Sequence, residues 1–204
     1  VKVIIMACKR DQRNEDSGNR AKRHRSGEGE GGEDEIFVLN GTPAVHNEVE
    51  NDREGTDERG FEYLEHPADI LMHAWGRTDE EALAALVEAL YGVLTERSAI
   101  NEVYSYEMEA EGDQEDVLVF NMLQEALFAF QAEPYFVGRR VEISELRRDE
   151  ENGGRMTGVT VRAWGESFEM GRHMQKNDVK APTYSNMQIR RENGKVDVYC
   201  VVDV

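Results

Sequence analysis

Two acidic residues in the sequence each lie beside an apolar run with the character of a strand. Asp69 precedes the run from Ile70 to Gly76, and Asp203 is followed by Val204 at the end of the sequence. If the two segments meet in the fold, the carboxyl groups of Asp69, Asp203 and Val204 would converge. Carboxylates held close together repel one another unless a cation or protons neutralise them, so the chemistry to expect is cation binding. Spacing alone equally allows two ordinary carboxylates at a turn and a strand end.

Other chemistry has little support in the sequence. The chain has no glycine-rich phosphate loop ending in Gly-Lys-Ser/Thr, no dinucleotide-binding glycine motif after a strand and no Gly-x-Ser-x-Gly turn. His66, His73 and His173 are candidate zinc ligands, but none has a paired histidine spacing and no cysteine joins them. We therefore expect no enzyme activity. A metal-dependent phosphoester hydrolase remains an alternative, with only His66 near enough in sequence to Asp69 to act as a general base.

The charge balance restricts the partners. The formal net charge is −18 for 204 residues, and most of it falls in residues 61–204. Because nucleic-acid affinity depends mainly on contacts between cationic side chains and phosphates, we expect no direct nucleic-acid binding. An acidic surface suits solubility, a divalent cation or docking on a basic protein.

Cysteine usage and hydropathy indicate an intracellular, soluble protein. The chain has two cysteines, Cys8 near the start of the sequence and Cys200 in an apolar run near its end. Two cysteines in such different segments do not indicate a disulfide framework. The apolar run at residues 1–8 is too short for a signal-peptide core, and no run reaches membrane-spanning length. We therefore expect no membrane association.

The chain divides near residue 60. Residues 1–60 are polar and glycine-containing, so we predict a disordered acidic and basic tail, followed by one domain over residues 61–204. Within the tail, Lys9-Arg10 and the basic run 22–25 have the spacing of a two-part nuclear import signal. A solvated charged tail explains the same residues, so the predicted location is cytoplasmic, nuclear or both.

Hydrophobic periodicity after residue 60 predicts an α+β domain. Two amphipathic helices are expected, the first after a capping box at Thr78–Glu81 and the second from near Asp113 until before Pro134. The predicted strands cover residues 70–76, 103–110, 136–146, 156–164, 167–170, 179–189 and 196–204. We expect both helices to pack on one face of a mostly antiparallel sheet whose C-terminal half is rich in hairpins. The last strand, apolar on both faces, should be central and covered on both sides.

Several segments taken together resemble the archease family. They are Tyr63–Ile70 with its His-x-Ala-Asp motif, Ala74-Trp75-Gly76, Val179–Tyr184 and the final Val202-Asp203-Val204. The likeness covers residues 61–204 in order. It leaves out the predicted tail.

This resemblance implies a function and a ligand set. Archease-like proteins are small α+β cofactors that activate the RtcB-type RNA ligase, which uses GTP and manganese to join RNA halves in tRNA splicing and repair. They speed guanylylation of the ligase, allow repeated turnover and bind a divalent cation, usually calcium. Carried over to this sequence, the cation ligands would be Asp69, Asp203 and a main-chain or terminal oxygen of Val204. These ligands fill only part of the six to eight oxygen positions of calcium.

The sequence departs from the family pattern at two prolines. Pro67 replaces the usual threonine beside the metal loop, and Pro182 replaces a branched residue, so we expect residues 179–189 to form an edge or broken strand. Lys180 and Tyr184 match family positions and are candidates for contact with the ligase or for ordinary strand packing. The alternative function is a chaperone or modulator of another RNA-modifying enzyme, such as a tRNA methyltransferase.

Overall fold

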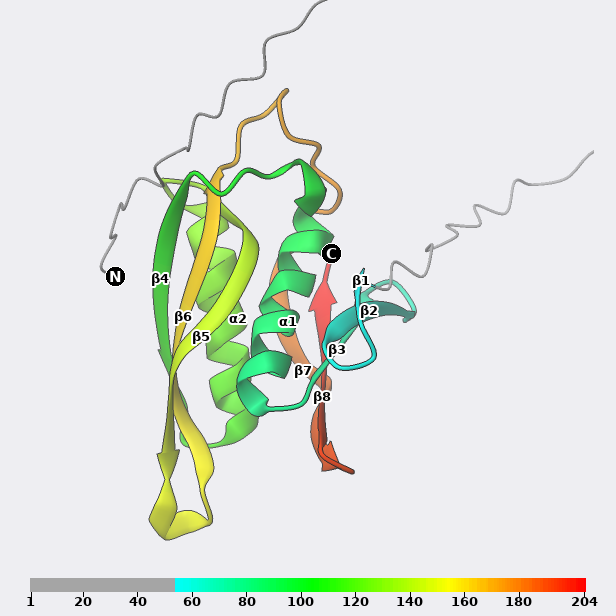
Figure 1. Cartoon of the computed structure of the whole chain (residues 1–204). Coiled ribbons are helices and arrows are strands. Elements are labelled where there is room, and N and C mark those ends of the chain that lie inside the picture. Colours follow the sequence, from blue (N-terminus) through cyan, green and yellow to red (C-terminus); the bar gives the residue numbers. More distant parts are fainter. Residues whose placement is uncertain (1–53) are drawn as a thin grey trace, which may run out of the picture. The chain divides into compact units, whose positions relative to one another are not determined.

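The computed structural model of the chain describes residues 54–204 (Figure 1). The predicted import signal, Cys8 and most of the predicted tail lie outside the described residues. The strands are β1 (Glu54–Gly55), β2 (Gly60–Glu65), β3 (Ile70–Gly76), β4 (Tyr104–Glu111), β5 (Phe136–Asp149), β6 (Arg155–Ser167), β7 (Ala181–Glu192) and β8 (Lys195–Asp203). The α-helices are α1 (Asp79–Leu94) and α2 (Glu115–Gln131), and two short 3-10 turns are η1 (Arg97–Ala99) and η2 (Glu150–Asn152).

The strands form two antiparallel sheets with both helices between them (Figure 1). One sheet has the order β1-β2-β3-β8-β7 and the other the order β4-β6-β5. Each helix contacts strands of both sheets. The predicted α+β class and antiparallel pairing are therefore confirmed. The expected single sheet is instead two, and each presents one face to the helices.

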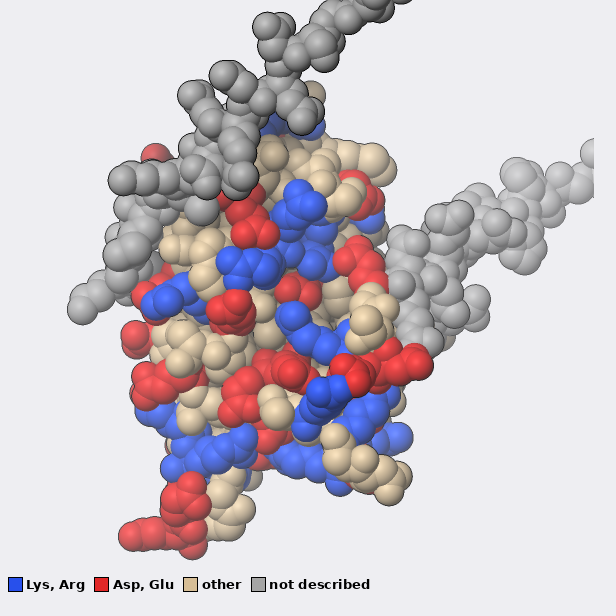
Figure 2. All heavy atoms as spheres, viewed as in Figure 1, with Lys and Arg blue, Asp and Glu red and all other residues tan. Residues whose placement is uncertain are grey.

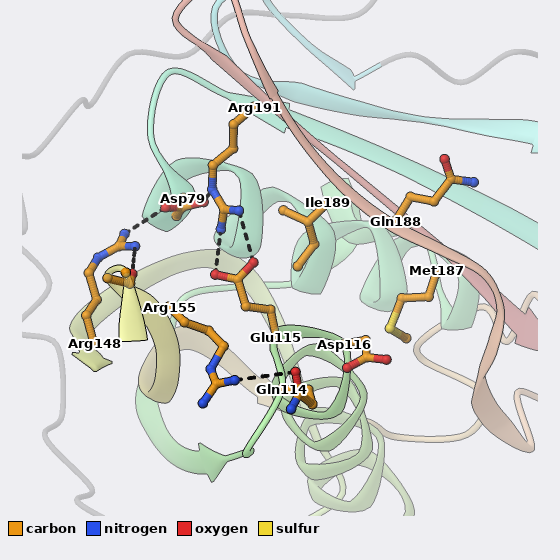
Figure 3. A pocket seen from close by; sticks show the side chains of 12 residues that line it. Asp79, Gln114, Glu115, Asp116, Arg148, Arg155, Met187, Gln188, Ile189 and Arg191 are labelled. Carbon is orange, nitrogen blue, oxygen red and sulfur yellow. Dashed lines mark hydrogen bonds and ion pairs between the residues drawn. The ribbon is translucent and has the colours of Figure 1, made fainter. Parts of the chain in front are cut away.

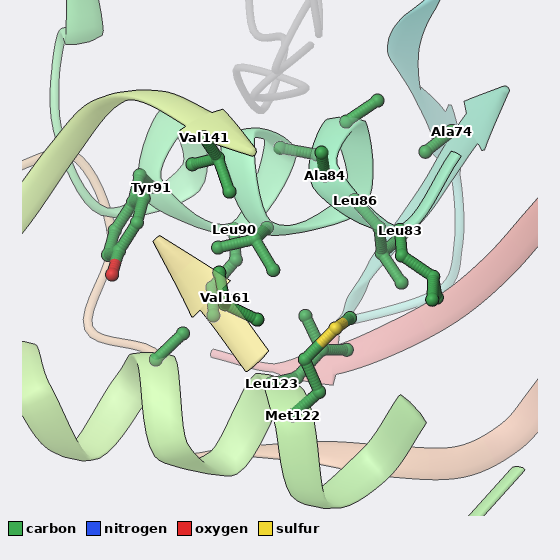
Figure 4. Packing of buried hydrophobic residues seen from close by; sticks show 14 of the residues in the cluster. Ala74, Leu83, Ala84, Leu86, Leu90, Tyr91, Met122, Leu123, Val141 and Val161 are labelled. Atoms are coloured by element: carbon green, nitrogen blue, oxygen red, sulfur yellow. The ribbon is translucent and has the colours of Figure 1, made fainter. Parts of the chain in front are cut away.

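The helix α1 is more buried than the predicted amphipathic helix, because it lies between the two sheets. Most of its residues are buried, because one side packs on β3 and the other on β5. Figure 4 shows Leu83, Leu86 and Leu90 of α1 meeting Met122 of α2 and Val161 of β6. A helix covered on two sides buries residues around most of its circumference.

The first helix begins as its sequence predicts. The Thr78 hydroxyl accepts a hydrogen bond from the Glu81 amide, and the Glu81 carboxylate accepts one from the Arg77 amide. These contacts satisfy free amide groups at the helix start. Only Arg77 and Thr78 lie between the end of β3 and the start of α1, so the cap determines where the helix begins after the strand.

The two C-terminal strands largely follow the prediction. β8 is central, between β3 and β7, and β7 is an edge strand whose pairing is interrupted between Thr183 and Gln188. On the outer face of β8, Val201 is fully buried, whereas Asp197 and Tyr199 are only partly buried. The outer face is therefore more open than an all-apolar strand would require.

One predicted strand is wrong. β6 ends at Ser167, and residues 168–180 form a connection with isolated bridges in place of a strand at 167–170. The apolar residue in this stretch, Phe168, packs edge-on against Phe130 of α2 at 5.2 Å between ring centroids. It thus anchors a loop to a helix. Within residues 54–204, the helices are too short or too polar to cross a membrane.

Candidate functional site

The strand register brings the two predicted aspartates to one corner of the five-stranded sheet. β3 and β8 are antiparallel, with Ile70 opposite Val202. Asp69 directly precedes Ile70 and Asp203 directly follows Val202, so the two aspartates flank the last pair of this register. Asp69 follows a tight turn in which Ala68 has a positive φ of 67°, so the turn delivers its carboxylate at the start of β3. The two aspartates are 134 positions apart in the sequence, and the pairing of β3 with β8 brings their segments together.

A lysine ammonium already lies at this acidic corner, which we define as Asp69, Asp203 and Val204. The Lys180 Nζ donates to the Val204 main-chain oxygen at 2.8 Å and lies 3.6 Å from the Asp203 carboxylate. The Lys180 amide also donates to the Asp203 main-chain oxygen at 2.8 Å. On the other side, His66 Nδ1 lies 3.6 Å from the Asp69 carboxylate. The corner therefore presents oxygens that contact positive charge.

The donors at the acidic corner fit a hard divalent cation in chemical type. Carboxylate and main-chain oxygens are the ligands that calcium prefers, and calcium takes six to eight of them. Within residues 54–204, histidine, cysteine, aspartate and glutamate side chains form no group of three or more arranged to hold a metal ion. Asp69 and Asp203 are thus two side-chain donors, and the Val204 oxygen is a third atom of the right kind. A complete shell needs oxygens from water or from a partner.

The three candidate zinc histidines do not meet. His66 lies beside Asp69, His173 beside Glu166, and His73 on the outer face of the five-stranded sheet. Each has its own carboxylate neighbour. A shared zinc site is therefore not formed among the described residues.

The His73 cluster is a charged group that the sequence motifs did not identify. His73 lies between Glu62 on β2 and Asp197 on β8, with both ring nitrogens 2.8 Å from carboxylate oxygens, and its ring stacks on Tyr199 at 4.3 Å. Burial opposes ionisation of Asp197, but hydrogen bonds from His73 and Lys195 outweigh it, so the pKa of Asp197 lies below its usual value. The signal that could have found this cluster is the period of two along three adjacent strands, which puts these residues on one face.

A second histidine cluster holds the connection after β6. The Glu166 carboxylate is buried and accepts hydrogen bonds from the Asn101 amide at 2.8 Å and from Arg172 at 2.7 Å, while His173 Nε2 lies 3.3 Å away. The Glu169 amide donates to His173 Nδ1 at 2.9 Å, so the ring carries its proton on Nε2. Burial opposes ionisation of Glu166, but the bonds from Asn101 and Arg172 lower its pKa overall.

A cavity among the described residues lies elsewhere, at the N-terminal ends of both helices. It has a volume of about 740 Å³. Figure 3 shows the Asp79 carboxylate accepting hydrogen bonds from Arg148 and Arg191, each at 2.7 Å. Arg191 also donates two hydrogen bonds to the Glu115 carboxylate, at 2.9 and 3.0 Å. These charged groups neutralise one another across the two sheets. The arrangement is that of a structural clamp.

The surface of the domain mixes both signs of charge. On the face shown in Figure 2, acidic and basic side chains alternate over most of the described residues, and acidic groups gather at the tip of the β5–β6 hairpin. On the three-stranded sheet, Arg162 of β6 pairs with Glu107 of β4 at 2.9 Å. Such exposed pairs add little to stability but balance the local charge.

The fold and the acidic corner define a class, that of small α+β proteins built from two helices between two antiparallel sheets. A family model described as the Archease protein family (MTH1598/TM1083) matches residues 61–204. The chain belongs to the archease family.

Relatives from distant organisms support this membership. The chain is 44% identical over 153 residues to a protein archease-like of Caenorhabditis elegans, covering 75% of this chain and 95% of that protein. It is 38% identical over 161 residues to a protein archease-like of Drosophila melanogaster, covering 77% and 99%. A protein archease of Aeropyrum pernix is 32% identical over 145 residues, with coverage of 71% and 97%.

Solved structures extend the comparison. The solution structure of Methanobacterium thermoautotrophicum protein 1598 matches with a TM-score of 0.57 and 26% identity, covering 71% of this chain and 98% of that one. A crystal structure from Thermotoga maritima, described as an archease and possible chaperone, matches with a TM-score of 0.37 and 20% identity. The first supports the fold. The second is too distant in structure to add to it.

Proposed function

We propose that this chain is a non-catalytic, cation-binding activator of an RtcB-type RNA ligase, which promotes GTP-dependent guanylylation and repeated turnover in tRNA splicing. The observation that supports the proposal most directly is the pairing of Ile70 with Val202, which Asp69 and Asp203 flank, in a member of the archease family. The proposed location is intracellular, cytoplasmic or nuclear, where such a ligase works. The partner is the ligase itself, and the RNA contacts the ligase.

The proposed cation is calcium, held by Asp69, Asp203 and the Val204 oxygen. A bound calcium ion would supply positive charge and further coordination positions for oxygen atoms. Pairing of β3 with β8 and of β8 with β7 fixes the backbone of the strands that Asp69 precedes and Asp203 ends. Lys180 neutralises Asp203 and Val204 through its ammonium, which limits repulsion at the corner in the absence of a divalent ion.

The proposal is tested with the purified chain and its cognate ligase. The chain should raise the rate of GMP transfer to the ligase and allow several ligation cycles per ligase molecule. Asp69→Asn and Asp203→Asn should each weaken both effects, because each removes a charged oxygen donor from the corner. Asp113→Asn, at an exposed position before α2, is the matched control and should behave as the parent chain. Parent-like rates with both corner variants would contradict a functional cation site.

The alternative partner is a different RNA-modifying enzyme, such as a tRNA methyltransferase. The acidic composition suits docking on any basic protein. Affinity capture with the tagged full chain separates the two functions. Recovery of a methyltransferase without any ligase would favour this alternative.

A further inference from the structure

Two of the exposed apolar side chains of the domain lie on one loop. Among the described residues, the large apolar side chains that are exposed are Val103, Phe128, Tyr135, Met170, Met174 and Tyr184. Met170 is 88% exposed and Met174 65% exposed. Both lie on residues 168–180, which we call the methionine loop. Single exposed apolar residues are common, but several close together mark an interaction surface.

Two of the other exposed residues are hydrogen-bonded to the chain at or just before the start of this loop. The Val103 amide donates to the main-chain oxygen of Gly165, two residues before β6 ends, at 2.9 Å. The Phe168 amide donates to the main-chain oxygen of Tyr135 at 2.7 Å. Met170 and Met174 therefore lie on the methionine loop and Tyr135 is bonded to its first residue, while Val103 is bonded to β6 three residues before the loop begins.

The methionine loop is anchored along its length to the C-terminal end of α1. The Thr95 hydroxyl donates to the Met174 main-chain oxygen at 2.6 Å, the Lys176 amide donates to Leu94, and the Asn177 side chain donates to Val93. In the middle of the loop, buried His173 lies against Glu166. Each anchor uses backbone or inward-facing groups. The loop thus presents Met170 and Met174 from a fixed backbone, and a preorganised surface loses less conformational entropy on binding.

The loop also leads into the acidic corner. It ends at Lys180, whose ammonium contacts Val204 and Asp203. In Figure 1 the loop, coloured orange, lies at the end of the domain toward which β8 points. The loop that carries the two methionines is thus joined to the acidic corner through Lys180.

Charge indicates the chemistry of that partner. The basic residues of the loop, Arg172, Lys176 and Lys180, each lie within ion-pair distance of a carboxylate of the same chain. Lys180 offsets one of the two negative charges of Asp69 and Asp203, so these three side chains together keep a net negative charge at the corner. A complementary surface combines an apolar pocket with neighbouring basic groups.

We propose that the methionine loop is the apolar half of the docking surface for the partner ligase, with the acidic corner as its charged half. This inference rests on the proposed function. Methionine suits the role because its flexible, polarisable side chain adapts to an apolar pocket, and it is enriched in protein interfaces. Met170 and Met174 bury their exposed surface in the complex and contribute to affinity, whereas the corner determines the effect on guanylylation.

The test compares polar and apolar replacements at the same two positions. The double variant Met170→Gln, Met174→Gln removes apolar surface without changing charge, and Met170→Leu, Met174→Leu retains it. Affinity of each full chain for the intact ligase is measured by calorimetry, with melting temperatures to show that both variants are folded. The glutamine variant should bind about tenfold or more weakly, as expected for two interface anchors, and the leucine variant within about threefold of the parent.

The outcomes separate this inference from the function on which it rests. Parent-like binding by the glutamine variant overturns the docking role of the loop while leaving the activator function intact. Failure of the parent chain itself to bind the ligase overturns both. Self-association of the parent chain that the glutamine variant abolishes, seen by sedimentation, would assign the surface to a second copy and overturn the proposal.

Discussion

Loss of the Asp79 carboxylate should destabilise the fold more than loss of any exposed acidic group. Asp79 is buried at the first turn of α1 and accepts charge-assisted hydrogen bonds from Arg148 on β5 and Arg191 on β7, both at 2.7 Å. The two arginines come from different sheets. Asp79 thus links both sheets to the helix layer, and its negative charge also suits the helix N-terminus.

The magnitude follows from those contacts. A hydrogen bond to a charged group contributes about 1.5–3 kcal/mol. Both arginines are partly exposed, so solvent screening places each bond near the lower end of that range. After Asp79→Asn, Arg191 keeps Glu115 and Arg148 keeps the Gly154 main-chain oxygen at 3.2 Å, so neither is left without a partner. We therefore expect a loss of about 2–3 kcal/mol in the free energy of unfolding.

Urea denaturation followed by circular dichroism measures this loss. With an m-value of about 2 kcal/mol/M, the midpoint should fall by about 1 M at unchanged m. Glu111→Gln is the control, because Glu111 pairs with Arg147 at an exposed position and its loss should cost less than about 1 kcal/mol. An Asp79→Asn midpoint no lower than that of the control would refute the reasoning.

Two further predictions concern packing and pH. Gly165→Ala should lower the free energy of unfolding by about 3 kcal/mol or more, because a Cβ there would lie 1.9 Å from the Val137 main-chain oxygen, and melting temperature measures the loss. Gly158→Ala on the same strand meets only the movable end of Arg147 and should cost far less; equal melting temperatures would contradict the packing argument. Stability should also fall as pH drops below about 4, because the pKa values of Glu166 and Asp197 are lower in the folded state than in the unfolded state. The two carboxylates therefore stabilise the fold fully above their unfolded-state pKa values. This stabilisation is lost as pH falls through their folded-state pKa values. Glu166→Gln should flatten this dependence in acid denaturation curves, and an unchanged slope would argue against it.

Local patterns in the sequence were enough to predict most elements of the fold. The capping box at Thr78 is a short-range signal, and the structure confirms the helix that it predicts. The division into two sheets was not predictable, because it depends on which strands pair over long separations. The 167–170 error has the same origin, since Phe168 packs against Phe130 of α2, which is distant in sequence.

The candidate site shows the same limit. Residue types and the family resemblance identified Asp69 and Asp203, but only the pairing of β3 with β8 shows that they share a corner. The contacts of Lys180 with Asp203 and Val204 depend on how β7 joins the sheet edge. Predicting the His73 cluster requires the register of three neighbouring strands, and no single sequence motif gives that register.

The claim at the centre of this account is that a divalent cation binds where β3 begins and β8 ends. Isothermal titration of calcium into the full chain, alongside Asp69→Asn, Asp203→Asn and the Asp113→Asn control, tests it most directly. The account predicts saturable binding at one site by the parent and the control, weakened at least tenfold in both corner variants. Binding of equal strength in all four chains, or no binding by the parent, would contradict it.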